Sequence, residues 1–221
     1  MQGPDQSEPA NARSRYSTPK RDQRAAATRA AILTAAERLF LSHGYARTSM
    51  KAIATEAAVS EKTMYLAFTS KATLLRQVIQ HAVRGDETAT PLSERPEWRA
   101  LVSGPVNEVF ARFAAMNTAL MIRTAAIVEL GETAAQSDPE LAQYRDHAHQ
   151  ETRTDLGALA AELERRGALA PDVSWQDAAD TIYALATDES VYLRLTRECG
   201  WTPARYAELI ARCLEATLAP K

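Results

Sequence analysis

The hydrophobic pattern of residues 49–68, SMKAIATEAAVSEKTMYLAF, predicts two very short helices with a three-residue break between them. Apolar side chains keep helical spacing up to Ala57, the spacing breaks at residues 58–60, and it then resumes. Ser49 and Ser60 each stand directly before one of the two segments, where a hydroxyl can cap a helix. Isolated helices shorter than about 12 residues are marginal in water, so the pair needs a longer helix to support it.

Longer helices are predicted on both sides of this pair. The first follows Thr18, a good capping residue, with Pro19 at the first helical position, and should end at Gly44. The second should start after Ser70 and run to about Gly85. One face of the first helix is apolar and consists of Ile32, Ala35, Ala36, Leu39 and Phe40.

The remainder of the chain also has a helical pattern. Residues 86–97, DETATPLSERPE, hold two prolines and many polar groups, and we expect a linker there. Beyond it, apolar stripes at helical spacing recur and no segment alternates as a strand would, so we predict an all-α protein. The predicted organisation is a disordered arm over residues 1–18, a first helical domain over 19–85, the linker, and a second helical domain over 98–221.

Charge is divided unevenly between these parts. Residues 1–80 carry 12 Lys and Arg against 6 Asp and Glu, a net of +6, whereas the remainder carries 14 against 22, a net of −8. This division favours contact of the first part alone with a polyanion, although an uneven solvated surface would give the same balance. Because the chain shows neither a signal peptide nor an apolar run of about 18 residues, we expect a cytoplasmic protein without membrane contact.

Two short helices joined by a three-residue turn and packed on a longer helix form a helix-turn-helix. In that motif the N-terminal residues of the second helix reach base edges in the major groove of DNA. Those residues are Glu61, Lys62 and Thr63 here, with Tyr65 one turn later. Lys62 can donate to guanine or phosphate, and Glu61 can accept from cytosine N4. The alternative is one more helical hairpin of a bundle that never meets DNA.

Residues 44–75, GYARTSMKAIATEAAVSEKTMYLAFTSKATLL, resemble the helix-turn-helix signature of the TetR family of bacterial transcriptional regulators. Three positions depart from that signature. Ala58 stands where the family usually has Gly, Ala67 replaces a His or aromatic residue, and Thr73 replaces a frequent Glu that would complete a capping box with Ser70. The matching positions are Gly44, Tyr45, Thr48, Ser49, Ile53, Ala54, Ala57, Val59, Ser60, Thr63, Tyr65, Phe68, Ser70 and Lys71.

The resemblance implies a three-helix helix-turn-helix DNA-binding domain followed by a helical ligand-binding and dimerisation domain. It implies a homodimeric regulator, most simply a repressor, that binds an inverted-repeat operator in double-stranded DNA and responds to a small-molecule effector. By resemblance, Thr48 and Ser49 would hold phosphates at one helix N-terminus, and Lys71 would hold another phosphate. The complete expected DNA-binding set is Thr48, Ser49, Ser60, Glu61, Lys62, Thr63, Tyr65 and Lys71.

The dimer interface is expected to be a four-helix bundle formed by residues 174–198 and 203–218 of both subunits. By resemblance, the walls of an effector pocket are expected within about residues 105–166. Asn117, Arg123 and Thr124 fall on or beside an apolar face there, where an unpaired polar group would be costly. The alternative for each pocket candidate is a locally satisfied core or interface residue. The interface candidates are Trp175, Ile182, Tyr192, Ile210 and Leu214, and the pocket candidates are Asn117, Arg123, Thr124, His147, Thr152 and Tyr183.

An enzyme, a metal site and a cofactor are not predicted. The sequence has no Gly-x-Ser-x-Gly motif and no phosphate-binding glycine-rich loop. His147 and His149 are two residues apart, and on a helix that spacing directs them to different faces. The competing functional hypothesis is an all-helical scaffold that does not bind an operator.

Overall fold

The computed structural model of the protein describes residues 18–85 and 96–220, and all regular structure in these ranges is helical. The all-α prediction is therefore confirmed for this part of the chain. The predicted arm up to residue 17 and residues 86–95 of the predicted linker lie outside the described residues. Thr18, which we assigned to the arm, begins the first helix, and Pro96 and Glu97, which we assigned to the linker, begin the fifth.

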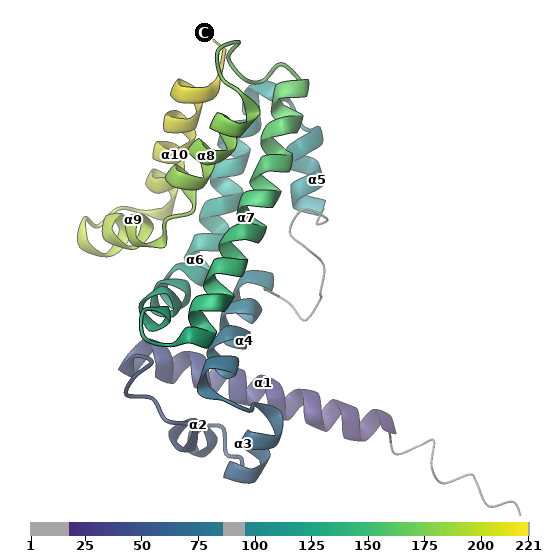
Figure 1. Cartoon of the computed structure of the whole chain (residues 1–221), viewed down its shortest axis with the longest axis vertical. Helices are drawn as coiled ribbons and strands as arrows, with labels where there is room; N and C mark the ends of the chain where they lie inside the picture. The colour runs from purple at the N-terminus through teal and green to yellow at the C-terminus, as the bar shows by residue number, and fades with distance from the viewer. Residues whose placement is uncertain (1–17, 86–95, 221) are drawn as a thin grey trace, which may run out of the picture.

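Within the described residues, four α-helices lie before residue 86 and six lie after residue 95. Figure 1 shows α1, α2 and α3 at one end of the molecule, α5, α8 and α10 towards the other, and the long α6 and α7 running between. A 3-10 turn, Val106–Glu108, leads into α6, and a π-helical turn, Arg194–Glu198, follows α9. The helices are α1 (Thr18–His43), α2 (Met50–Glu56), α3 (Glu61–Ala67), α4 (Lys71–Arg84), α5 (Pro96–Ser103), α6 (Val109–Ala135), α7 (Pro139–Arg165), α8 (Trp175–Ala186), α9 (Glu189–Leu193) and α10 (Pro203–Leu218).

Local capping chemistry sets the bounds of the short helices, as predicted. Ser49, Ser60 and Ser70 have extended backbones and accept a hydrogen bond from the N–H three residues later, at 3.1, 3.0 and 2.9 Å respectively. Each bond satisfies an amide that the helix itself cannot pair. Gly44 and Gly85 follow α1 and α4 with positive φ, the conformation that commonly ends a helix.

The turn between α2 and α3 is strained at one residue. Ala58 has φ of +53°, and it is the one non-glycine residue with positive φ in the part of the chain that the structure describes. A Cβ in this conformation crowds the backbone and costs roughly 1–2 kcal/mol. The glycine usual at this position in the resembling family would avoid that cost.

We expect Ala58→Gly to stabilise the protein by about 0.5–1 kcal/mol, because relief of the strain exceeds the greater unfolded-state entropy of glycine. Ala58 is exposed, so its methyl group contributes little packing. The measurement is urea unfolding at equilibrium. A midpoint equal to or below that of the unchanged protein would show that the turn is not strained.

Two hydrophobic cores share α6 and α7. The lower core joins α1–α4 to Ile127, Ala134 and Ala135 of α6 and to Leu141 of α7. The upper core joins α5, α8, α9 and α10 to the first half of α6 and the second half of α7. The helix-turn-helix is therefore packed directly on one end of the α6–α7 pair.

The segment Val106–Ala135, which contains α6, is long and apolar enough by length and composition to cross a membrane, with a mean hydropathy of 1.3 over its most apolar window. We did not single it out from the sequence. Its buried face belongs to both cores, from Val109 and Phe113 in the upper to Ile127 in the lower. This packing is that of the central helix of a globular protein.

Candidate DNA-binding interface

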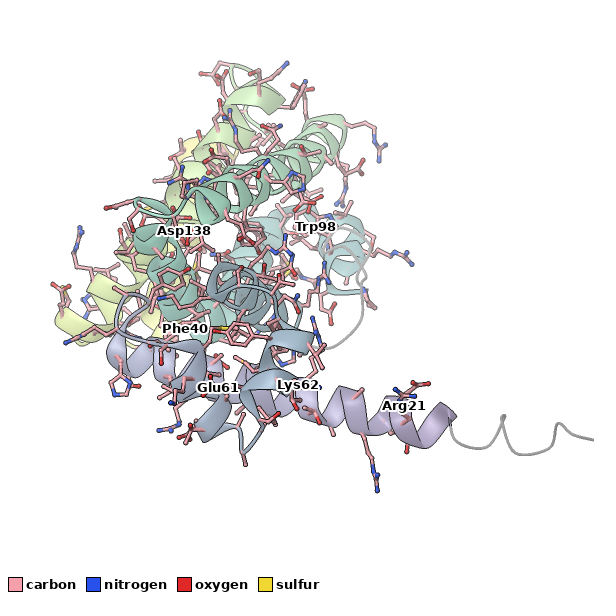
Figure 2. The ribbon with its side chains drawn as sticks, turned by 60° about the horizontal axis from the view of Figure 1, so that its bottom comes forward. Arg21, Phe40, Glu61, Lys62, Trp98 and Asp138 are labelled. Atoms are coloured by element: carbon pink, nitrogen blue, oxygen red, sulfur yellow. The ribbon has the colours of Figure 1, made fainter. Side chains whose placement is uncertain are left out.

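The helix α3 divides sharply into a buried and an exposed side. Met64 is fully buried, and Phe68, which directly follows the helix, is also buried against α1 and α4. Glu61 and Lys62 are exposed at the start of the helix, at the outer surface of the molecule in Figure 2. Tyr65 is 54% exposed. The residues predicted to read bases are thus on the free side of the helix.

The remaining predicted polar residues shape the N-termini of α2 and α3. Ser49 and Ser60 are exposed caps, and the Thr63 hydroxyl lies 2.8 Å from Ser60 Oγ. Glu61 lies in the first turn of α3, 3.7 Å from the ammonium of Lys51 on α2. This pair is well exposed, so DNA can compete for both groups at little cost.

Thr48, which we expected to hold a phosphate at the start of α2, has a buried side chain. It is only 3% exposed, and its hydroxyl faces the carbonyls of Gly44 at 2.8 Å and Leu39 at 3.2 Å. A buried hydroxyl with these acceptors fastens the end of α1 to the turn before α2. Its place in the motif is therefore structural.

The ammonium of Lys71 is held beside the α1–α2 turn. Its Nζ donates to the backbone carbonyl of Tyr45 at 2.9 Å and lies 4.2 Å from the centre of the Tyr45 ring. An ammonium has three donors, so a phosphate can still be bound while these contacts persist. Burial, together with a 2.8 Å hydrogen bond to Asp138, raises the pKa of the Tyr45 phenol, so the phenol stays a donor.

Two residues of this region were missed by sequence reasoning. Leu66 is 79% exposed on α3 beside Tyr65, and an apolar side chain there can meet a thymine methyl. Arg29 of α1 donates to the carbonyl of Ala67 at 3.2 Å, and its guanidinium lies 4.5 Å from the centre of the Phe68 ring. In the sequence, Leu66 is recognisable only as an apolar residue outside the stripe that was expected to be buried. Arg29 could not be identified from the sequence, because its contacts are with residues far away in the chain.

The exposed N-terminal half of α1 adds basic groups near this surface. Arg21 and Arg24 are exposed, and Figure 2 shows Arg21 on the part of α1 that extends past α3. Lys20, grouped with them in the sequence as a possible electrostatic contact, has a side chain outside the described residues. These groups can attract a polyanion without reading its sequence.

The structure corrects three effector-pocket candidates. Asn117 is buried and donates to the carbonyl of Ala186 at 2.6 Å, and Thr124 is buried and donates to Leu120 of its own helix at 2.9 Å. Arg123 donates to the last carbonyls of α4, those of Ala82 and Val83. All three are satisfied structural residues, which was the alternative for each.

The other pocket candidates lie on or near the middle of α7. His147 is exposed and 3.5 Å from Glu151, and the Thr152 hydroxyl donates to its own helix at 3.0 Å. Tyr183 differs, because its ring lies 6.3 Å from that of His149, which is 3.1 Å from Glu132. Burial raises the pKa of the Tyr183 phenol.

A carboxyl group close to this cluster is also perturbed. Burial of Glu189, at the start of α9, and its proximity to Glu132, Asp188 and Glu129 raise the pKa of that carboxyl to about 7. Polar and acidic side chains therefore gather between the two cores, where the middle of α7 has no buried residue. No group of His, Cys, Asp and Glu able to hold a metal occurs among the described residues.

The predicted dimer-interface residues are mostly core residues. Ile182, Tyr192, Ile210 and Leu214 are all buried within one chain and pack in the upper core, and only Trp175 is partly exposed. These four predictions were wrong because an apolar stripe looks the same in sequence whether it meets its own core or a partner.

The faces of α8 and α10 that do not pack in the upper core are formed by other residues of the same helices, and we call them the outward sides. Leu185 of α8 is 37% exposed, and Leu209 and Cys213 of α10 are half-buried. Leu209 directly precedes the buried Ile210, and successive residues of an α-helix point roughly 100° apart, so Leu209 is turned partly away from the buried face of α10.

Comparison with known proteins agrees with this geometry. Residues 32–78 match the family model of bacterial regulatory proteins of the tetR family. None of the curated proteins matches the chain in sequence. The structure of NalD, the secondary repressor of the MexAB-OprM multidrug efflux pump in Pseudomonas aeruginosa, is similar, with a TM-score of 0.66 and 25% identity over 89% of this chain and 98% of that chain.

Two further solved structures share the fold. A putative transcriptional regulator from Saccharomonospora viridis in complex with choline has a TM-score of 0.69 and 18% identity, over 87% of this chain and 98% of that chain. SmeT, the repressor of the Stenotrophomonas maltophilia multidrug efflux pump SmeDEF, has a TM-score of 0.64 and 17% identity, over 86% of this chain and 90% of that chain.

Proposed function

We propose that this chain, whose helix-turn-helix belongs to the tetR family of bacterial regulatory proteins, is a dimeric, sequence-specific DNA-binding repressor in the cytoplasm. The observation that carries the proposal is the free side of α3. Glu61, Lys62, Tyr65 and Leu66 are exposed together on a helix whose other side is fixed in the core by Met64. Together, these four side chains can contact both the polar edges of bases and the methyl groups of thymine.

A two-fold dimer would compensate for the shortness of α3, the helix that we expect to contact bases and that we call the reading helix. One helix of seven residues, Glu61–Ala67, reaches few base pairs, whereas two copies read two half-sites of an inverted repeat. The net charge of +6 over residues 1–80 favours binding driven by counterion release, while the acidic remainder repels DNA from the rest of the molecule. We propose that the outward sides of α8 and α10 form the dimer.

A small-molecule effector is the second part of the proposal. NalD is a repressor linked to a multidrug efflux pump, and the Saccharomonospora viridis regulator was crystallised with choline. In this chain, the polar cluster of Glu132, His149 and Tyr183 between the two cores is the best-placed candidate region. A ligand bound there can change the position of one core relative to the other and so alter the affinity for the operator.

The experiment that tests the proposal is operator selection with the purified protein, using genomic fragments, followed by footprinting. A repressor of this kind protects two half-sites related by two-fold symmetry, and its binding weakens as salt is raised. A scaffold protein would protect no fragment at any salt concentration. The genes beside the selected operator would then suggest effectors to test.

Tyr65→Ala is expected to weaken operator binding by roughly 5- to 100-fold, because the side chain is removed from both half-sites without touching the core. The exposed position of Tyr65 predicts an unchanged thermal melt. Tyr65→Phe is the matched variant, since it keeps the ring and loses only the hydroxyl. The measurement is fluorescence anisotropy with the selected operator, and wild-type affinity for Tyr65→Ala would remove Tyr65 from the interface.

A further inference from the structure

Four carboxyl groups gather where α9 packs against α6, at the side of the molecule in Figure 1. Glu129 and Glu132 lie three residues apart on α6 and therefore share a face of that helix. Asp188 caps α9, and Glu189 is the first residue of α9. We call Glu129, Glu132, Asp188 and Glu189 the acidic cluster. Like charges held this close are unfavourable unless a cation neutralises them or some of them are protonated.

Two carboxyl groups of the acidic cluster are already engaged. Glu132 lies 3.1 Å from Nε2 of His149 on α7. Asp188 accepts from the Ser190 hydroxyl at 2.6 Å and from the Val191 amide at 3.1 Å, and Arg194 is the cation that acts on it.

The other two carboxyl groups have no cation of their own. Within the described part of the chain, neither Glu129 nor Glu189 forms an ion pair with another side chain. Both residues are only half-buried, so a small molecule can reach them. The cluster thus has more negative charge than the protein neutralises.

A buried hydroxyl without a partner lies beside the acidic cluster. Tyr206 of α10 is fully buried, and its hydroxyl has no hydrogen-bond partner among the described residues. Burial, together with the charges of Asp188 and Glu189, raises the pKa of this phenol to about 12, so the hydroxyl lies near the start of α9 and stays protonated. A buried hydroxyl left unpaired destabilises a protein, and a bound group that pairs with it would account for its presence.

An aromatic ring of α8 borders the same cluster. Burial raises the pKa of the Tyr183 phenol, and the charges of Glu132 and Glu189 act in the same direction. The guanidinium of Arg153 lies 5.8 Å from the centre of this ring, but it is paired with Asp180 at 3.1 Å. An aromatic ring beside unpaired carboxylates is a combination that attracts organic cations.

We infer that the acidic cluster, together with Tyr183 and Tyr206, binds a small organic molecule that carries one cationic nitrogen. The inference rests on the proposed function, because it names the chemical class of the effector. A protonated amine can donate both to a carboxylate and to the Tyr206 oxygen, while its apolar part contacts the aromatic rings. An anion would be repelled by the four carboxyl groups.

Binding of such a cation should be coupled to release of a proton. Burial and the charges of Glu132, Asp188 and Glu129 raise the pKa of Glu189 to about 7, so this carboxyl is partly protonated at neutral pH. A bound cation stabilises the ionised form, so its affinity should fall as the pH is lowered below about 7. Protonation of His149 would also oppose a cation, and the two phenols stay neutral in this range.

Two pairs of probes with matched shapes test the inference by isothermal titration calorimetry of the whole purified protein. Choline is compared with its neutral analogue, in which a carbon atom replaces the nitrogen, and benzylamine is compared with benzyl alcohol. We expect at least one cation to bind roughly tenfold or more tightly than its neutral partner, with a proton released. If neither cation binds more tightly than its partner up to millimolar concentration, the inference is overturned.

Substitutions of single carboxyl groups locate the site. Glu189→Gln keeps the shape and removes the charge, so it should weaken cation binding roughly 10- to 100-fold and remove most of the proton release. Glu129→Gln should act in the same direction and serves as the second variant. Glu208→Gln, at an exposed position of α10, is the matched control and should bind the cation as the parent does. Parent affinity in both folded cluster variants would also overturn the inference.

Tyr206→Phe distinguishes a binding role of the hydroxyl from a structural one. The substitution removes only the unpaired hydroxyl, so the thermal melt should stay the same or rise. Binding of benzylamine should weaken by roughly three- to tenfold, because one acceptor is lost. A lower melting temperature with unchanged binding would overturn the place of Tyr206 in the site.

Operator binding then separates the inference from the proposed function. If the parent selects an operator, the cation that binds should change operator affinity, and Glu189→Gln should remove that change. If the cation binds as expected but the parent selects no operator, the cation site stands and the proposed function fails. If the parent selects an operator and neither cation exceeds its neutral partner, the proposed function stands and the cation site fails.

Discussion

Replacement of Leu209 by Glu is expected to convert the protein into folded monomers and to remove tight operator binding. Leu209 lies half-buried on the outward side of α10, where a dimer would cover it completely. An unpaired carboxylate buried in an interface costs roughly 3–5 kcal/mol, and each symmetric dimer would contain two. A monomer reads a single half-site, so its affinity should fall towards the non-specific range of about 10⁻⁴–10⁻⁶ M.

Ile210→Glu is the matched control one residue away. Ile210 is 4% exposed and packs in the upper core of its own chain, so a carboxylate there should unfold the protein rather than separate two folded subunits. Sedimentation equilibrium and a thermal melt distinguish the two results. A Leu209→Glu protein that remains dimeric would place the interface away from this side of α10, and a native Ile210→Glu monomer would restore the interface predicted from the sequence.

Loss of the Lys62 side chain is expected to change sequence preference more than overall affinity. Lys62 is exposed at the start of α3, where a base contact contributes about 1–3 kcal/mol of discrimination in each half-site. Discrimination between operator and scrambled DNA should therefore fall by roughly 5- to 150-fold per half-site in Lys62→Ala. The measurement is binding to both duplexes across a salt series.

Lys71→Ala provides the contrast for that experiment. Its ammonium is held at the Tyr45 carbonyl beside the start of α4, a position suited to a phosphate rather than a base. We expect weaker binding to all duplexes alike and a salt slope smaller by about one for each subunit. If Lys62→Ala weakens both duplexes equally while Lys71→Ala changes neither slope nor affinity, the two roles are wrongly assigned.

The local structure of the helix-turn-helix region can be predicted from its sequence. Ser49, Ser60 and Ser70 cap their helices through bonds that span only three residues, so the pattern of serines and apolar positions was sufficient to place α2, α3 and α4. The family resemblance pointed to Ala58 as an unusual turn residue, and its φ of +53° shows the strain. Hydrogen bonds and turn conformations between residues that are close in sequence can therefore be predicted without knowledge of the fold.

Hydrogen-bond partners that lie far away in the sequence cannot be predicted in the same way. Arg123 was a pocket candidate because it lies beside an apolar stripe in the sequence, but nothing in the sequence indicates that its guanidinium bonds the end of α4 about 40 residues away. Thr73 was read as a weakened cap, whereas its hydroxyl bonds Glu140, 67 residues further along the chain. Polar residues of this kind resemble ligand-binding groups until their protein partners are known.

Interfaces pose a related difficulty. The stripe containing Ile210 and Leu214 was identified correctly as apolar, and its assignment to a partner subunit was wrong because the chain's own core uses it. Burial in the folded chain distinguishes the two sides of α10, and hydrophobic spacing alone does not. Thr48 illustrates the same point for a hydroxyl, since its acceptors lie in its own backbone.

The most direct test of the central claim is the salt dependence of binding to a selected operator and to a scrambled duplex of equal length. A sequence-specific dimer predicts that log affinity falls steeply and linearly with log salt on both duplexes, and that the operator binds at least about 1,000-fold more tightly at physiological salt. Equal affinity for the two duplexes at every salt concentration, or no binding to either, would contradict the account.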